Sequence, residues 1–301
     1  MSTTTVARGL PRVLDKYMLP KVAFTLVSLA SLAGASLTGL RHGVTDWPGW
    51  VLRWAAYWLP ALLLGTEIWK LFYLQPSVRL RPVPNAVEYA TAMLQLHRRW
   101  QKVLAPLAAL AVAADMVHYS VLRPSSLPLG LAAGGLLLVG LAGIWLDRPA
   151  VTLVGLAGAV ATMAALDVRL EPAGHAWLLI PNRMLHMWAF SAWLGGALWN
   201  IFIAVPAGLP RQNMDTVILA NFQLERFRVV VRTVFPTIVA TGLVQAWAMF
   251  GFRWEALFTS VWGWLVLLKV GLILVLVGVF ITCPMWKACS PIRGVCDLDD
   301  L

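Results

Sequence analysis

Eight long apolar runs constrain what this chain can fold into more than any other feature. They cover, in order, residues 22–40, 51–74, 103–122, 127–146, 150–166, 181–206, 229–250 and 261–282. A helix needs about 20 residues to cross a hydrocarbon core of ~30 Å, and only the fifth run is short of that length. The sequence therefore predicts an all-α polytopic membrane helix bundle of about eight transmembrane helices.

The composition agrees with this prediction and excludes several other classes of protein. Charged residues make up 13% of the chain, where a soluble domain carries about 25%. The net charge of +10 would suit a nucleic-acid binder only if Lys and Arg gathered on a soluble face. They are instead scattered between the apolar runs, so we expect no nucleic-acid partner, and three Cys in 301 residues exclude a disulfide-stapled module.

Topology follows from the distribution of positive charge. With the N-terminus inside, 16 Lys and Arg fall on predicted cytoplasmic segments and six on outer ones, as the positive-inside rule requires. Both termini are then cytoplasmic, and membrane lipid, anionic on the inner leaflet, is an expected partner. We divide the chain into an N-terminal segment (1–21), a five-helix part (22–170), a three-helix part (171–282) and a cytoplasmic tail (283–301). Two shorter helices, 86–100 and 215–227, are expected to lead into spans from the inner surface.

Two histidines lie at similar depth in the outer leaflet. At ~1.5 Å per residue, His118 is ~6 Å from the end of its span and His186 ~7 Å from the start of its own. Met116 and Met187 are close to them in sequence. Imidazole with thioether suits copper, whereas two facing imidazoles suit a b-type haem. The sequence therefore predicts a metal site with these four residues as ligands, although helix–helix hydrogen bonding and ordinary core packing are alternative roles for the same residues.

Charged residues within the apolar runs need partners, because an isolated charge at membrane depth is costly. Asp115 shares a helical face with His118 and is expected to fix the orientation of its ring. Lys269 lies ~12 Å into its span, and Asp115 is the first candidate for its partner. Glu67 is expected to pair with Lys70, three residues on. Lys269 then serves either as one half of a structural ion pair or in a relay of charge.

Several motifs in the second half of the chain resemble a known family. His186 is followed by WLGG at 193–196, ERF at 225–227, TGLVQA at 241–246 and TSVWGWLVLLK at 259–269. In this order they resemble the membrane domain of CopD-type copper resistance proteins, over residues 182–279. The resemblance implies a bacterial inner-membrane protein of about eight helices linked to copper uptake or tolerance, with His186 and Lys269 at the carried-over positions. A related group, the protoporphyrinogen oxidases, has a comparable His and Lys around haem, which keeps haem b open as the alternative cofactor.

The tail departs from the family pattern. It reads CPMWKACSPIRGVC and places Cys283, Met285 and Cys289, with Cys296 further on, at the predicted cytoplasmic mouth. Thiolate and thioether groups bind Cu(I), so these residues are a possible second metal site. The Cys spacing matches no established metal motif, and buried or lipid-modified Cys is the alternative.

Together these patterns predict a copper-binding or copper-transport protein that accepts copper at a periplasm-facing His/Met site. A periplasmic copper carrier or a larger membrane complex is the expected partner. The alternatives are a haem b-binding electron-transfer subunit and a structural or assembly subunit. No nucleotide-binding glycine loop and no Ser-His-Asp pattern is visible, so neither ATP-driven pumping nor hydrolytic activity is expected.

Overall fold

Helices form all of the regular secondary structure that the computed structural model describes. It describes residues 18–74, 84–169, 176–211, 213–251, 253 and 255–282, so the predicted Cys283, Met285 and Cys289 site lies outside the described residues. The long helices are α1 (Met18–Arg41), α2 (Trp47–Trp69), α4 (Pro84–Leu122), α5 (Leu127–Trp145), α6 (Pro149–Arg169), α7 (Ala176–Leu198), α9 (Met214–Phe250) and α11 (Val261–Thr282). Short elements are the π-helical η1 (Lys70–Leu74) and η3 (Trp199–Ala204), the 3-10 helix η2 (Pro124–Ser126), and α8 (Val205–Gly208) and α10 (Glu255–Thr259).

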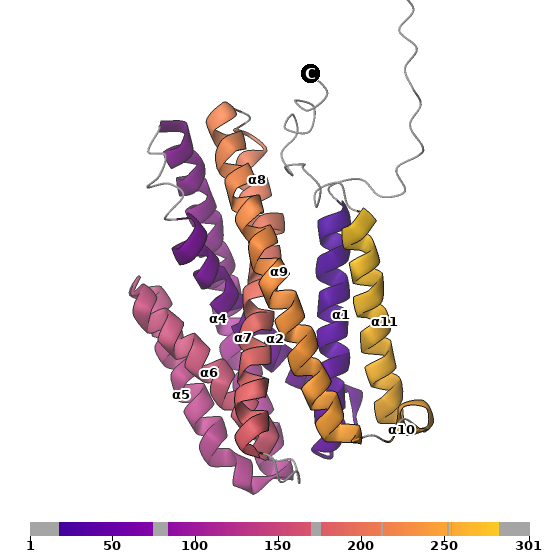
Figure 1. The fold of residues 1–301 in the computed structure, drawn as a ribbon. Helices are drawn as coiled ribbons and strands as arrows, with labels where there is room; N and C mark the ends of the chain where they lie inside the picture. The colour runs from indigo at the N-terminus through magenta and orange to yellow at the C-terminus, as the bar shows by residue number, and fades with distance from the viewer. Residues whose placement is uncertain are drawn as a thin grey trace, which may run out of the picture.

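The long helices run roughly along one direction, as Figure 1 shows. Helices α5 and α6 form a hairpin on one side, and α1 packs against α11 on the other. Helix α1 begins and α11 ends at the same end of the bundle, which we call the inner end, and we call the opposite end the outer end. An even number of membrane crossings puts the start of α1 and the end of α11 on the same side of the membrane. The predicted topology makes this inner end cytoplasmic.

The polytopic helical bundle predicted from the apolar runs is confirmed. Among the described residues, seven helices are long and apolar enough to cross a membrane. Helix α2, which covers most of the predicted span 51–74, is not among the seven although it is 23 residues long. Its Trp, Pro and charged residues lower its hydropathy, and the bundle tolerates them because α2 packs against α1, α4, α6 and α7. This helix is the centre of the bundle rather than a lipid-facing span.

Close approach of two backbones fixes α2 against α7. A Cβ atom at Gly195 would overlap the backbone of Gly65, and one at Gly65 would overlap the Ser191 carbonyl. The indole of Trp69 also donates a hydrogen bond of 3.0 Å to the Ala192 carbonyl of α7. The glycines of the WLGG segment therefore allow α7 to pack closely against α2.

The two predicted surface helices are wrong as separate elements. Residues 86–100 are the first part of α4, a single helix of 39 residues, and residues 215–227 are the first part of α9, a helix of 37 residues. Asn213 caps α9 by accepting a hydrogen bond from the Thr216 amide. Both segments pack against neighbouring helices, which buries residues such as Tyr89 and Leu219 and keeps each helix continuous.

Candidate functional site

Arg53 is the hub of a polar cluster near the outer end of the bundle. Its side chain is 1% exposed, and its Nη1 lies 2.5 Å from Asp115 Oδ2 on α4. Its other terminal nitrogen donates to Asp167 on α6. Arg183 on α7 reaches the second oxygen of Asp167 at 3.0 Å, so two guanidinium groups balance two carboxylates. We call Arg53, Asp115, Asp167 and Arg183 the outer cluster.

Aromatic and imidazole rings surround the outer cluster. The Arg53 guanidinium carbon lies 3.9 Å from the centre of the Tyr119 ring, a cation–π contact. His42, in the loop after α1, donates from Nε2 to the Asp167 carbonyl at 3.1 Å and accepts at Nδ1 from the Tyr119 hydroxyl at 3.3 Å. The pKa of His42 is lowered to about 4, because burial, the largest cause, and the charges of Arg53 and Arg183 outweigh the opposing effect of Asp167. The imidazole is therefore neutral at pH 7 and joins three helices.

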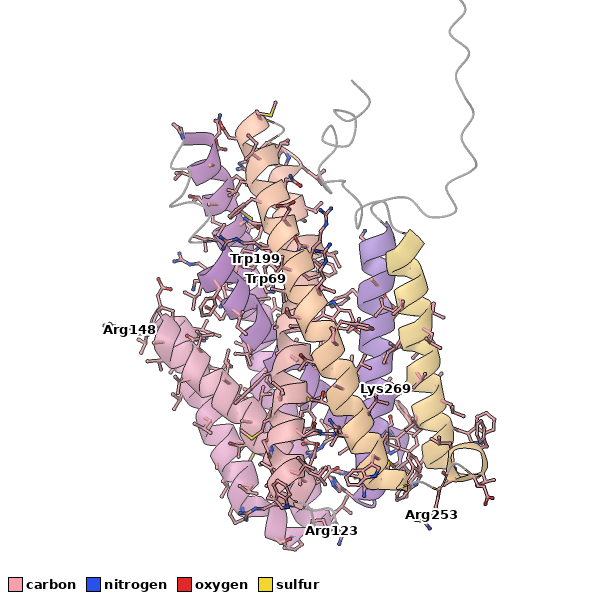
Figure 2. All side chains as sticks on the ribbon, viewed as in Figure 1. Trp69, Arg123, Arg148, Trp199, Arg253 and Lys269 are labelled. Carbon is pink, nitrogen blue, oxygen red and sulfur yellow. The ribbon has the colours of Figure 1, made fainter. Side chains whose placement is uncertain are left out.

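The predicted pairing of Asp115 with Lys269 is wrong. Arg53 occupies Asp115 instead, because α2 lies between α4 and the α1–α11 pair. Lys269 lies in the outer half of α11 (Figure 2), with its Nζ so close to Gly34 of α1 that a Cβ there would be 3.0 Å away. Within the described residues its ammonium makes no hydrogen bond and no ion pair.

A small pocket adjoins the outer cluster between α4, α5 and α6. Its lining residues come from four helices and one 3-10 turn and are Arg53, Val112, Asp115, Met116, Tyr119, Ser126, Leu127, Gly130, Ala133, Met163 and Leu166. Met116 packs against Gly134, where a Cβ would lie 3.1 Å from its sulfur. Asp115, which lines this pocket, has a buried oxygen, Oδ1, without a hydrogen-bond partner in the described structure, and so does Nε2 of His118, three residues further along α4.

His186 lies on α7 and is held by α9. Its Nδ1 is 2.8 Å from the Thr241 hydroxyl oxygen, and that hydroxyl is 2.6 Å from the Thr237 carbonyl. Because the single hydroxyl proton goes to the carbonyl, Thr241 must accept from His186 Nδ1–H. The lone pair of the imidazole is therefore on Nε2. Met187, the next residue, is 9% exposed and belongs to the hydrophobic core.

The four predicted ligands fall into two places. Met116 and His118 are on α4 beside the outer cluster, whereas His186 and Met187 are on α7. Within the described residues the two imidazoles make no hydrogen bond or ring contact with one another. Nor do these residues contain a group of three or more His, Cys, Asp or Glu side chains placed to hold a metal. The ligand set stays a prediction, and the geometry favours separate roles for α4 and α7.

A second group of ionisable residues lies in the inner half of the bundle. Glu67 of α2 is 1% exposed, and its Oε2 lies 3.4 Å from Lys70 Nζ, which confirms the predicted pair. Lys70 Nζ is also 3.6 Å from a carboxylate oxygen of Asp147, in the turn after α5. Arg98 on α4 reaches the other Asp147 oxygen at 3.8 Å.

His97 completes this group, although the sequence placed it in a cytoplasmic segment. Its side chain is 1% exposed, and its Nε2 lies 3.7 Å from Glu67 Oε1. Gln101, one turn further along α4, donates to the same Glu67 oxygen. The imidazole packs on Trp199, the first residue of η3, with 5.3 Å between the ring centres. We call Glu67, Lys70, His97 and Asp147 the inner cluster.

Sequence reasoning missed Arg53, Asp167 and His97 as central residues. Arg53 lies near the start of the apolar run 51–74 and Asp167 directly follows the run 150–166, and a charge at the edge of a span is a signal in itself. For His97 the signal is the spacing of Met93, His97 and Gln101, four residues apart, which puts three buried side chains on one helix face. Two π-helical turns, η1 and η3, flank the inner cluster, and such turns are frequent at functional sites.

Comparison with known proteins identifies one region of the chain. Residues 223–288 match the family model CopD, copper resistance protein D. The match includes Thr241 and Lys269, while His186 and the WLGG segment precede it. No curated protein and no solved structure matches the chain. The predicted resemblance is confirmed for this region: the chain is a multi-pass membrane protein whose residues 223–288 are similar to the CopD family.

Proposed function

We propose that this copper-resistance-related membrane protein accepts copper as its cargo at the outer end of α4. The observation that carries the proposal is the pair of unpartnered buried ligand atoms, Asp115 Oδ1 and His118 Nε2, one turn apart on α4. The thioether of Met116 lines the adjoining pocket, and so does that of Met163 from α6. Thioether and imidazole groups together suit Cu(I), and a carboxylate adds the negative charge that a cation needs.

Arg53 has a positioning role in this proposal. It holds Asp115 through Oδ2, so that Oδ1 stays directed away from the guanidinium and available to a cation. It also carries a positive charge close to the pocket, which weakens binding and favours release of the cargo. A soluble copper carrier that docks at the outer end is the partner class that would supply the ion.

Copper loading of the purified protein tests this function. We expect the double variant Met116→Leu/His118→Gln to lose most of the Cu(I) that the wild-type protein retains after gel filtration. Met184→Leu is the matched control, because Met184 is a partly buried methionine on α7, away from the pocket. Equal copper in the wild type and the double variant would contradict a site on α4.

A second candidate function is haem b binding at His186, and the tautomer of this residue favours it. Nε2 carries the lone pair that an iron ligand needs, and Thr241 fixes the orientation of the ring through its hydrogen bond with Nδ1. The ammonium of Lys269, which has no partner among the described residues, would suit an anionic group such as a haem propionate. A Soret band in the purified protein that disappears in His186→Ala would support haem. If protein supplied with haem shows no Soret band, haem binding is excluded and copper remains the proposed ligand.

A further inference from the structure

A chain of ionisable groups leads from the surface of the protein to its buried interior. Asp147 is 69% exposed, Lys70 14%, and both Glu67 and His97 only 1%. Successive charged or imidazole atoms along this path are 3.6, 3.4 and 3.7 Å apart. Such chains within a membrane protein mark routes for ions or protons more often than they add stability.

The buried end of this chain is incompletely bonded. Neither ring nitrogen of His97 has a hydrogen-bond partner, and Glu67 Oε2 has none besides its ion pair with Lys70. A neutral imidazole has one N–H donor and one lone pair, and leaving both unpaired in the interior costs about 1–3 kcal/mol for each group. A bound species that bridges the imidazole and the carboxylate would remove this cost.

We propose that Glu67 is a proton-binding site that exchanges with the inner side of the membrane. Without the proton, the Glu67 carboxylate pairs with the Lys70 ammonium, as the structure shows. With the proton, the Glu67 carboxyl group donates a hydrogen bond to His97 Nε2, and Lys70 turns to the Asp147 carboxylate. Lys70 is already within 4 Å of both carboxylates, so the exchange needs only a rotation of its side chain.

The proton transfer balances at every atom. Lys70 gives a proton to Glu67 and then takes one from Asp147, which has taken it from a hydronium ion at the surface and leaves water behind. Lys70 is an ammonium before and after the transfer, Asp147 returns to a carboxylate, and the inner cluster gains one positive charge. Among the residues that the structure describes, Arg98, which contacts Asp147 and lies near His97, is a further charged group that faces this path.

A proton fits the inner cluster better than a metal ion does. The Glu67 carboxylate already faces an ammonium group and accepts a hydrogen bond from Gln101. A divalent cation would therefore be repelled by the ammonium and would find one carboxylate oxygen already hydrogen-bonded. Among the described residues, no third His, Cys, Asp or Glu joins His97 and Glu67 to complete a metal site. The proposal goes beyond copper binding, since it uses different residues at the opposite end of the bundle.

Infrared difference spectroscopy tests the proposal on the full-length protein in phosphatidylcholine and phosphatidylglycerol bilayers. Lowering the pH in the wild-type protein should produce the C=O band of a buried protonated carboxyl group that shifts in D₂O. We expect this band to be lost in Glu67→Gln and kept in Glu88→Gln. Glu88 is the matched control because it is 64% exposed and pairs with Arg211, outside the inner cluster.

Two further variants test the roles of the neighbours. Lys70→Met removes the cation that stabilises the carboxylate, so the band should persist to higher pH than in the wild type, whereas the exposed Lys102→Met should not change it. His97→Leu removes the acceptor, so the band should move to higher frequency. A band that survives Glu67→Gln overturns the proposal. If that variant does not fold, a pH dependence of the band in Lys70→Met that equals that of the wild type overturns the proposal. Loss of the band on addition of Cu(I) also overturns it.

Discussion

The outer and inner clusters are both buried and polar, but they differ in how fully their charges are paired. In the outer cluster Arg53 lies between two carboxylates, and Arg183 takes the remaining oxygen of Asp167. In the inner cluster one ammonium, Lys70, is shared between two carboxylates. Paired charges hold one arrangement, whereas a shared cation is within reach of either carboxylate. The difference indicates that the outer cluster fixes the fold and that the inner cluster can switch.

Access to water separates the clusters as well. The Arg53, Asp115 and Asp167 side chains are 1–3% exposed, so their ion pairs are shielded from solvent. Exposure rises along the inner cluster from Glu67 to Asp147. A graded path of this kind lets a proton reach the interior, while the ion pairs that Arg53 makes in the outer cluster are screened from bulk water.

The largest effect is expected for Arg53→Met. This change leaves Asp115 without its cation and Asp167 with only Arg183, and loss of one partner of a buried ion pair costs about 3–5 kcal/mol. The free energy of unfolding in mixed SDS micelles measures it, with the exposed Arg123→Met as control. A loss below about 1 kcal/mol would show that the outer cluster does not stabilise the fold.

The next largest effect comes from His42 and depends on pH. Its pKa is lowered from 6.5 to about 4 in the folded protein, so the unfolded state binds more protons between these values. The contribution of neutral His42 to the free energy of unfolding should therefore be fully present above pH 6.5. It should decrease by up to about 3 kcal/mol as the pH approaches 4. Unfolding free energies of the wild type and His42→Gln, compared across this range, isolate the contribution. Parallel curves would rule out this role for His42.

A smaller effect is expected for His97→Leu at pH 8. Neither nitrogen of this imidazole makes a hydrogen bond in the structure, so the substitution removes only part of the contact with Trp199. The substitution also removes two unpaired buried polar atoms, so the unfolding free energy should fall by no more than about 1 kcal/mol, well below the loss for Arg53→Met. A loss as large as that of Arg53→Met would place His97 among the residues that hold the fold and remove the contrast between the clusters.

The smallest effect is expected for Glu88→Gln. Its ion pair with Arg211 spans 2.8 Å, but the Glu88 side chain is 64% exposed and the Arg211 side chain 29%. Exposed pairs contribute about 0–1 kcal/mol, so the unfolding free energy should hardly move. This measurement sets the baseline for the comparison, because it shows what the same kind of contact contributes outside the buried clusters. A change of several kcal/mol would mean that burial does not separate these pairs.

Parts of both clusters could be read from the sequence and parts could not. The pair of Glu67 and Lys70 is local, since residues three apart share a helical face, and the prediction was confirmed. The partner of Asp115 was predicted wrongly, because Arg53 and Lys269 are both cations in the outer half of the predicted spans. Which of them reaches Asp115 depends on the order of helices around the bundle, and no local spacing encodes that order.

Apolar length and the distribution of charge by themselves determined that this chain is a membrane-spanning bundle, because a hydrocarbon interior allows helices of one minimum length. Only the tertiary structure decided that α2, with its two internal charges, lies at the centre, and that His118 and His186 belong to different neighbourhoods. The physical reason is that depth in the membrane follows from position along a helix, whereas rotation and neighbours follow from packing between helices far apart in the chain.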